Sequence, residues 1–96
     1  MAHAVELARF ASEDEAGMLA TRGAAMAAIK AAYPGMIRAI LTRMDDGSYL
    51  DIVLWESRQD AEAAVAGMAQ LPDCAVWLGS IERVLSFEHG EVIDPA

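Results

Sequence analysis

The sequence predicts an α+β domain with the ferredoxin-like arrangement, a four-stranded antiparallel sheet with its helices on one face. Two observations predict this class. Apolar runs with strand-like alternation are interrupted by two alanine-rich segments with helical spacing, and their order along the chain is βαββαβ. The chain has 96 residues and contains neither an internal repeat nor a low-complexity linker, so residues 1–96 are expected to form a single domain.

The beginning of the chain predicts a strand followed by a long helix. Residues 4–10 alternate in polarity as a strand does. The next segment, SEDE, offers Ser12 as an N-cap with Glu15 three residues later, which is a capping box. Apolar residues then recur at helical intervals to about Ala32, and the tripeptide YPG that follows ends the helix.

Two apolar, β-branched runs in the middle of the chain, MIRAILTRM and YLDIVLWE, are joined by the turn sequence DDGS and predict a β-hairpin. With the turn centred on the DG pair, Thr42 would lie opposite Asp51, and Arg38 opposite Trp55. That face of the hairpin mixes polar and apolar side chains. The opposite face would be almost wholly apolar, with Ile37, Ala39, Leu41, Leu50, Ile52 and Leu54.

The rest of the chain predicts a helix, a short extra helix and a last strand. Ser57 has the position of an N-cap, and the helix that it begins extends to about Ala69. LPDCAVWLG at 71–79, with a proline early and a glycine late, indicates the short helix. The last strand is expected at 81–89, and the tail from about Gly90 is expected to be frayed or to contact a partner.

Composition and charge exclude several classes of partner. The net charge is −8 with no cluster of Lys or Arg, which argues against nucleic acid and against an anionic membrane. No apolar run approaches the roughly 20 residues of a membrane span, and MAHAVELARF does not resemble a signal peptide, so a cytoplasmic location is expected. Cys74 has no Cys or His at metal-ligand spacing, and no phosphate-binding glycine loop is present, so neither metal nor cofactor is expected.

The sheet is expected to have a face that its own helices do not cover. Two main helices can cover only one face, and neither face of the predicted hairpin has the composition of a solvated surface. The chain is 55% apolar, which is more than an isolated domain of this size usually needs to bury. A homodimer joined sheet to sheet is therefore expected.

Three features together resemble the antibiotic biosynthesis monooxygenase (ABM) domains, a family of the dimeric α+β barrel superfamily. They are the PG at 34–35, the hairpin, and LWES at 54–57 followed by an alanine-rich helix. The family includes cofactor-free oxygenases of aromatic polyketides, quinol oxygenases and haem-degrading enzymes. In the polyketide oxygenases, a tryptophan and an asparagine four residues earlier line the cavity between sheet and helices. The resemblance places those positions at Trp55 and Asp51.

The chain departs from the family pattern at several positions. A carboxylate replaces the amide at Asp51, and the family's aromatic residue in the second helix would fall on Ala61. The three residues that the haem-degrading members need would fall near Ala8, near Ala64 and within 74–77, where the required residue types are missing. The resemblance therefore does not imply haem binding.

The candidate site follows from the resemblance and from the chemistry of an oxygenase without cofactor. Asp51 is the candidate base, provided that burial raises its pKa, and Arg38 would hold the resulting substrate anion. Trp55 is the second catalytic candidate. The candidates for substrate binding on the cavity wall are Arg38, Thr42, Tyr49, Met68 and Trp77. The alternative is structural: an ordinary Asp51–Arg38 ion pair on a half-solvated sheet, with the aromatic residues and Met68 as packing.

Three functions remain open from the sequence. The first is a cofactor-independent monooxygenase acting on a small phenolic, quinol or polyketide-like aromatic compound. The second is a non-catalytic protein that binds a small ligand in the same pocket. The third is an isomerase or cyclase that uses Asp51 for proton transfer without oxygen. Oxygen uptake separates the first from the others, and ligand turnover separates the third from the second.

Overall fold

The fold is an α+β structure with one antiparallel sheet. The computed structural model describes residues 2–95. Its elements are β1 (Ala4–Ala11), α1 (Glu15–Ala32), β2 (Met36–Arg43), β3 (Tyr49–Trp55), α2 (Arg58–Gly67), a 3₁₀ turn (Met68–Gln70), α3 (Pro72–Leu78) and β4 (Arg83–Glu91). The four strands lie in the order β2-β3-β1-β4, and every neighbouring pair is antiparallel. The predicted ferredoxin-like class is confirmed.

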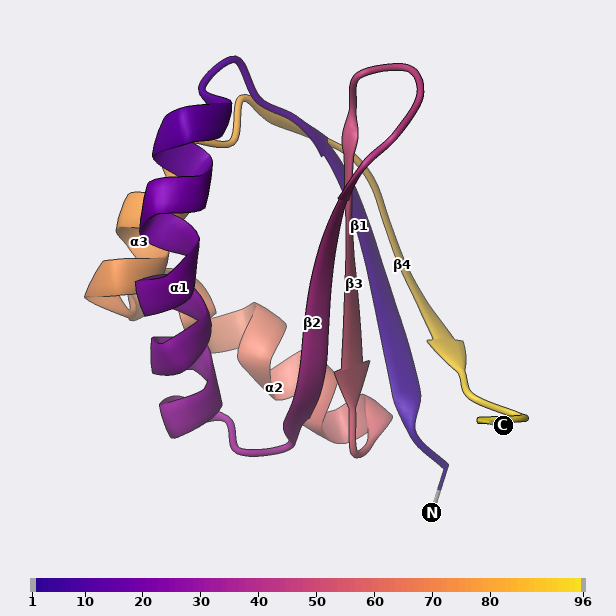
Figure 1. Cartoon of the computed structure of the whole chain (residues 1–96). Helices are drawn as coiled ribbons and strands as arrows, with labels where there is room; N and C mark the ends of the chain where they lie inside the picture. The colour runs from indigo at the N-terminus through magenta and orange to yellow at the C-terminus, as the bar shows by residue number, and fades with distance from the viewer. Residues whose placement is uncertain (1, 96) are drawn as a thin grey trace.

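The molecule has two layers, and one side of the sheet is bare. All three α-helices lie on the same side of the sheet, and the other side is covered by no element of residues 2–95 (Figure 1). α3 packs against α1, so these two helices and α2 form the layer that faces the sheet. None of the helices in the described chain is long and apolar enough to cross a membrane.

The two main helices begin at side-chain caps. Ser57 caps α2 as predicted, because its Oγ accepts a hydrogen bond from Asp60 N at 3.1 Å. The prediction for α1 is wrong by two residues: its N-cap is Asp14, which accepts from Gly17 N at 2.9 Å. The hydroxyl of Ser12 instead donates to Ser80 O at 2.6 Å, which ties the β1–α1 connection to the segment before β4.

The hairpin forms as predicted, but its register differs by one residue. Met44 N donates to Ser48 O at 2.8 Å, and Gly47 N donates to Met44 O at 3.0 Å. The loop therefore contains three residues rather than two, and Gly47 adopts the left-handed conformation (φ +87°) that such a loop requires. Leu41, not Thr42, is consequently paired with Asp51.

The shift exchanges the two faces of β2, because successive side chains of a strand point to opposite sides. Arg38 and Thr42 lie opposite Leu54 and Leu50 on the bare side of the sheet, away from Asp51. Leu41 is turned toward the helices instead. We call the bare side the open face; the apolar side chains at its centre are Val5, Leu7, Ile40, Leu50, Ile52 and Leu54.

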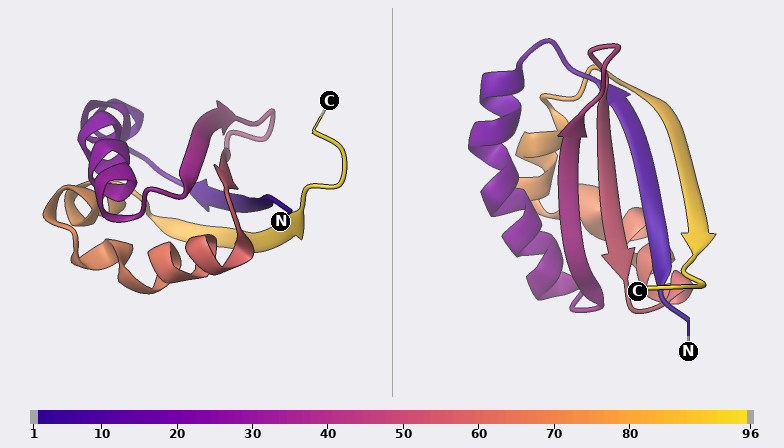
Figure 2. Two further views of the ribbon diagram at one scale, coloured as in Figure 1. Left: turned by 90° about the horizontal axis from the view of Figure 1, so that it is seen from below. Right: turned by 45° about the vertical axis from the view of Figure 1, so that its right-hand side comes forward.

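The end of the chain is more ordered than predicted. β4 continues to Glu91, and Val92 N donates to His3 O at 2.9 Å, so Gly90 lies inside a strand. Gly90 is therefore not frayed, because pairing with β1 extends to its first residue, Ala4; contact of the tail with a partner stays a prediction. After Val92 the chain turns to the side of the open face (Figure 2).

Candidate functional site

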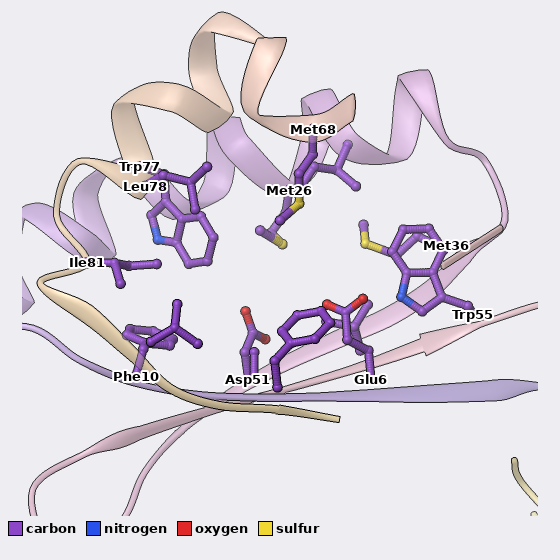
Figure 3. A pocket seen from close by; sticks show the side chains of 15 residues that line it. Glu6, Phe10, Met26, Met36, Asp51, Trp55, Met68, Trp77, Leu78 and Ile81 are labelled. Atoms are coloured by element: carbon purple, nitrogen blue, oxygen red, sulfur yellow. The ribbon is translucent and has the colours of Figure 1, made fainter. Parts of the chain in front are cut away.

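A pocket lies between the sheet and the helices. Glu6, Phe10, Asp51 and Trp55 project into it from the strands, while Met26, Met68 and Trp77 project from the helical side (Figure 3). The lining is almost entirely apolar apart from the two carboxyl groups. Its volume is about 90 Å³, smaller than the roughly 150 Å³ of a cavity that holds benzene. An aromatic ligand would therefore have to displace side chains, and the flexible methionines are suited to such movement.

Asp51 forms a buried ion pair with Arg22 of α1. Arg22 Nη1 donates to Asp51 Oδ2 at 2.8 Å and Nη2 donates to Oδ1 at 2.9 Å, so both carboxylate oxygens are engaged. The Arg22 side chain is 13% exposed and the Asp51 side chain is 7% exposed. The guanidinium carbon lies 5.3 Å from the ring centre of Trp77, in a cation–π contact that holds it in place.

Glu6 is the second buried carboxyl group of the pocket. It lies diagonally across from Asp51 on the same face, because β1 and β3 pair Glu6 with Val53 and Ala8 with Asp51. The residue is 6% exposed, and Oε1 has no hydrogen-bond partner within residues 2–95. Burial, together with the negative charge of Asp51, raises the pKa of Glu6 to about 7, although the indole of Trp55 acts in the opposite direction.

His89 lies beside Glu6 on the neighbouring strand. The two residues are cross-strand partners, and His89 Nε2 is 3.5 Å from Glu6 Oε1. The His89 side chain is only 11% exposed. Burial and the positive charge of Arg58 lower the pKa of His89, while Glu62 partly offsets them.

The predicted site residues separate into three groups. Asp51, Trp55, Met68 and Trp77 line the pocket. Tyr49 faces the helices but does not line the pocket. Its ring stacks on that of Phe10 with ring centres 5.6 Å apart, and its hydroxyl donates a hydrogen bond to Glu15.

Arg38 and Thr42 lie on the open face, where the Thr42 hydroxyl donates to Leu50 O at 3.1 Å. The expectation that they share a wall with Asp51 is wrong, because it depended on a two-residue turn. The cation beside Asp51 is Arg22.

Two functional candidates were missed, although the sequence contains a signal for each. Glu6 alternates with Ala4, Ala8 and Phe10, so a carboxylate stands among residues of a buried strand face. Arg22 is four residues from both Met18 and Met26, which places a charge on the apolar stripe of α1. A charged residue at a position where the pattern demands an apolar one is the signal in both cases.

The pocket also contains two indole groups that can donate hydrogen bonds. Trp55 Nε1 and Trp77 Nε1 are buried, and neither has a hydrogen-bond acceptor in the described chain. Both are available to an oxygen atom of a ligand. In the part of the chain that the structure describes, no group of three His, Cys, Asp or Glu side chains is arranged to hold a metal ion.

Comparison with known proteins shows similarity at the level of structure. The sequence matches no family model, and no curated protein matches it significantly. SnoaB, a cofactor-independent oxygenase from Streptomyces nogalater, superposes with a TM-score of 0.69 at 22% identity, over 100% of this chain and 96% of SnoaB. The chain shares the SnoaB fold.

Two further solved structures extend this similarity. A Caulobacter crescentus protein assigned as an antibiotic biosynthesis monooxygenase superposes with a TM-score of 0.74 at 16% identity, over 97% of this chain and 92% of that one. A Bordetella bronchiseptica protein with the same assignment superposes with a TM-score of 0.73 at 17% identity, over 97% of this chain and 99% of that one. The expected likeness to the ABM domains is therefore confirmed for the fold across nearly the whole chain.

Proposed function

We propose that this protein is a cofactor-independent oxygenase acting on a small phenolic, quinol or polyketide-like aromatic compound. The observation that carries the proposal is the apolar pocket with buried carboxyl groups and two unpartnered indole donors. The fold shared with SnoaB supports it. A binding protein needs only the apolar lining, whereas a buried carboxyl group with a pKa near neutrality is typical of proton transfer.

The chemistry requires an electron-rich substrate. Removing a phenol or enol proton gives an anion that can transfer an electron to O₂, and recombination forms a peroxide. For an anthrone, loss of water from the peroxide converts CH₂ to C=O, so that one O₂ is consumed and one oxygen atom enters the product. The protein then needs to bind the ring, accept a proton and exclude bulk water.

The residues of the pocket divide these tasks. Trp55, Trp77 and Met68 provide apolar surface against which a planar ring can stack. Asp51 contributes differently from the role first predicted for it, because both its oxygens accept from Arg22. We assign the pair the task of fixing a charged wall next to the ring, with Arg22 balancing the negative charge that forms on the substrate.

We also infer a homodimer joined through the open face. No element of the described chain covers the six apolar side chains at the centre of the open face. A second copy of the same face is the simplest cover, because a twofold interface needs only one self-complementary surface.

Oxygen consumption tests the oxygenase directly. With dithranol, a naphthohydroquinone and a simple phenol as probes, an oxygen electrode should record uptake with at least one compound, and isotopically labelled O₂ should leave one labelled atom in the dithranol product. Conversion without oxygen uptake would instead indicate an isomerase or cyclase. Saturable binding without conversion would indicate a binding protein. Either result would overturn the proposal.

Two conservative substitutions connect the activity to the pocket. Arg22→Lys keeps the charge but loses the two-pronged contact with Asp51, so the rate should fall about tenfold or more. Arg38→Lys is the matched control, because Arg38 lies on the open face. Equal rates in the two variants would contradict the assigned role of Arg22.

A further inference from the structure

Glu6 and His89 bring two buried polar atoms face to face. Glu6 Oε1 and His89 Nε2 are both buried, and neither atom has a hydrogen-bond partner within residues 2–95. The atoms are 3.5 Å apart, slightly beyond a hydrogen bond. Catalytic hydrogen bonds are often long in ligand-free structures and shorten when substrate binds. Two buried polar atoms without other partners, facing each other, indicate a site for one shared proton.

The two residues stand at different distances from the pocket. Glu6 lines the pocket, and its carboxyl group points into it (Figure 3). His89 does not line the pocket but packs edge-on against Phe87, which does, with ring centres 5.1 Å apart. A substrate would therefore touch Glu6, and Glu6 would touch His89.

The charged groups around the pair favour a proton on it. Asp51 faces Glu6 from β3 and disfavours a second negative charge, while Arg22 of α1 neutralises Asp51 itself. Arg58 and Glu62 act on His89 from α2 with opposite signs. The pKa of Glu6 is raised to about 7 and that of His89 is lowered, so the affinities of the two groups for a proton approach each other.

We propose that Glu6 and His89 form a shared-proton pair at the edge of the pocket, which takes up the hydroxyl proton of the aromatic substrate and later returns it. This inference rests on the proposed function. Glu6 is the catalytic residue, because it faces the substrate. His89 is a positioning residue that acts through Glu6.

The proton balance closes without another reactant. Glu6 Oε1 accepts the proton from the substrate oxygen, and His89 Nε2 shares it while the substrate anion reacts with O₂. The pair then protonates the peroxide anion. When the O–O bond breaks, Glu6 accepts the remaining proton from the carbon, and the leaving hydroxide takes that proton to become water. The sum is CH₂ plus O₂ giving C=O plus H₂O.

Asp51 is less suited to this task than Glu6. Arg22 donates to both of its oxygens, so accepting a proton would require a buried ion pair to open. The carboxyl group of Glu6 points into the pocket, and its Oε1 has no hydrogen-bond partner in the described chain. The geometry therefore assigns proton uptake to a residue on β1 rather than to the predicted one on β3.

NMR titration of the ligand-free protein tests the pair. With isotope-labelled glutamate and histidine side chains, Glu6 should titrate with a midpoint of about 7. His89→Gln should shift that midpoint by about half a pH unit or more, because Glu6 loses the group with which it shares a proton. Glu6→Gln should shift the His89 midpoint for the reciprocal reason. The protein contains two histidines, so His3→Gln both assigns the signals and serves as the control that shifts neither midpoint.

The titration decides the inference independently of catalysis. If Glu6→Gln leaves the His89 midpoint in place and His89→Gln leaves that of Glu6 in place, the pair does not exist, whatever the protein does with oxygen. A coupled titration without oxygen uptake would overturn only the proposed function. With uptake, the rate should rise with pH through about 7 as Glu6 ionises, and His89→Gln should move this rise by the same amount as it shifts the Glu6 midpoint. A purely structural His89 would alter the rate without moving the profile.

Discussion

At the scale of single residues, the pocket contains two carboxyl groups in opposite electrostatic situations. Asp51 is paired with the Arg22 guanidinium through two short hydrogen bonds. Glu6 is equally buried, but no group donates a hydrogen bond to its Oε1. A buried charge is tolerated when it is paired, and an unpaired buried carboxyl group is neutralised by a proton instead. The same face of the sheet therefore holds one group that fixes structure and one that can exchange a proton.

The pH dependence of stability should reveal Glu6. Its pKa in the folded protein, about 7, lies above the ordinary value of 4.5, so the native state keeps a proton that the unfolded chain releases. The contribution is fully present below about pH 4.5 and is lost as pH rises to about 7, a change of about 3 kcal/mol. Glu6→Gln lacks this loss. Urea unfolding at about pH 5 and about pH 8, at one protein concentration, measures the free energy of unfolding of both proteins. Between these two pH values, Glu6→Gln should become more stable relative to the wild type. A constant difference would contradict the raised pKa.

The Asp51–Arg22 pair should behave as a buried ion pair. Asp51→Asn leaves the Arg22 guanidinium buried opposite a neutral amide and should lower the free energy of unfolding by about 3 kcal/mol. Adding Arg22→Met should restore part of that loss, because the unpaired charge is removed. Glu15→Gln is the control, since the Arg43–Glu15 pair is exposed and should matter far less. Urea unfolding at constant pH measures all four proteins, and equal losses for Asp51→Asn and Glu15→Gln would be incompatible with this account.

At the scale of the elements, the sequence was sufficient for the order and class of the strands and helices but not for the hairpin register. Period-2 and helical spacing located the segments, and Ser57 marked the start of α2. The sequence DDGS permits a two-residue or a three-residue loop, and only the hydrogen bonds of Met44 and Gly47 distinguish them. Asp51 and Trp55 line the pocket from the central strand β3, whereas the predicted places of Arg38 and Thr42 depended on the register of an edge strand.

The geometry of the three-residue loop can be tested by comparing Gly47 in the loop with Gly23 in α1. Gly47→Ala should lower stability by about 1 kcal/mol, because its positive φ is unfavourable for a residue with a Cβ atom. Gly23→Ala in α1 should raise stability by about 1 kcal/mol through helix propensity. At both positions an added Cβ would meet nothing within 4 Å, so contacts do not confuse the comparison. Urea unfolding should give opposite signs; two changes of the same sign would argue against the loop geometry.

At the scale of the whole molecule, the layers leave the protein asymmetric. The helical side carries the pocket, while the centre of the open face consists of apolar side chains. The chain after Val92 turns toward the side of the open face (Figure 2), and Ile93 in this segment is 89% exposed. An apolar sheet face with an exposed apolar residue beside it has the character of an interface rather than of a solvated surface. A second copy would cover the centre of the face and offer a place for the tail.

A stable homodimer is therefore the expected state in solution, and one substitution on the open face should abolish it. Light scattering at micromolar concentration should give twice the chain mass for the wild type. Ile52 lies near the centre of the open face, opposite Ile40 on β2, so Ile52→Asp should place an unpaired carboxylate on each side of a twofold interface and give the monomer mass. Val76→Asp is the matched control, because Val76 is 63% exposed on α3 at the helical side, and it should remain dimeric. A monomeric wild type would rule out the interface. If both variants dissociated, the contact would have to involve the helices, and the open face would need another cover.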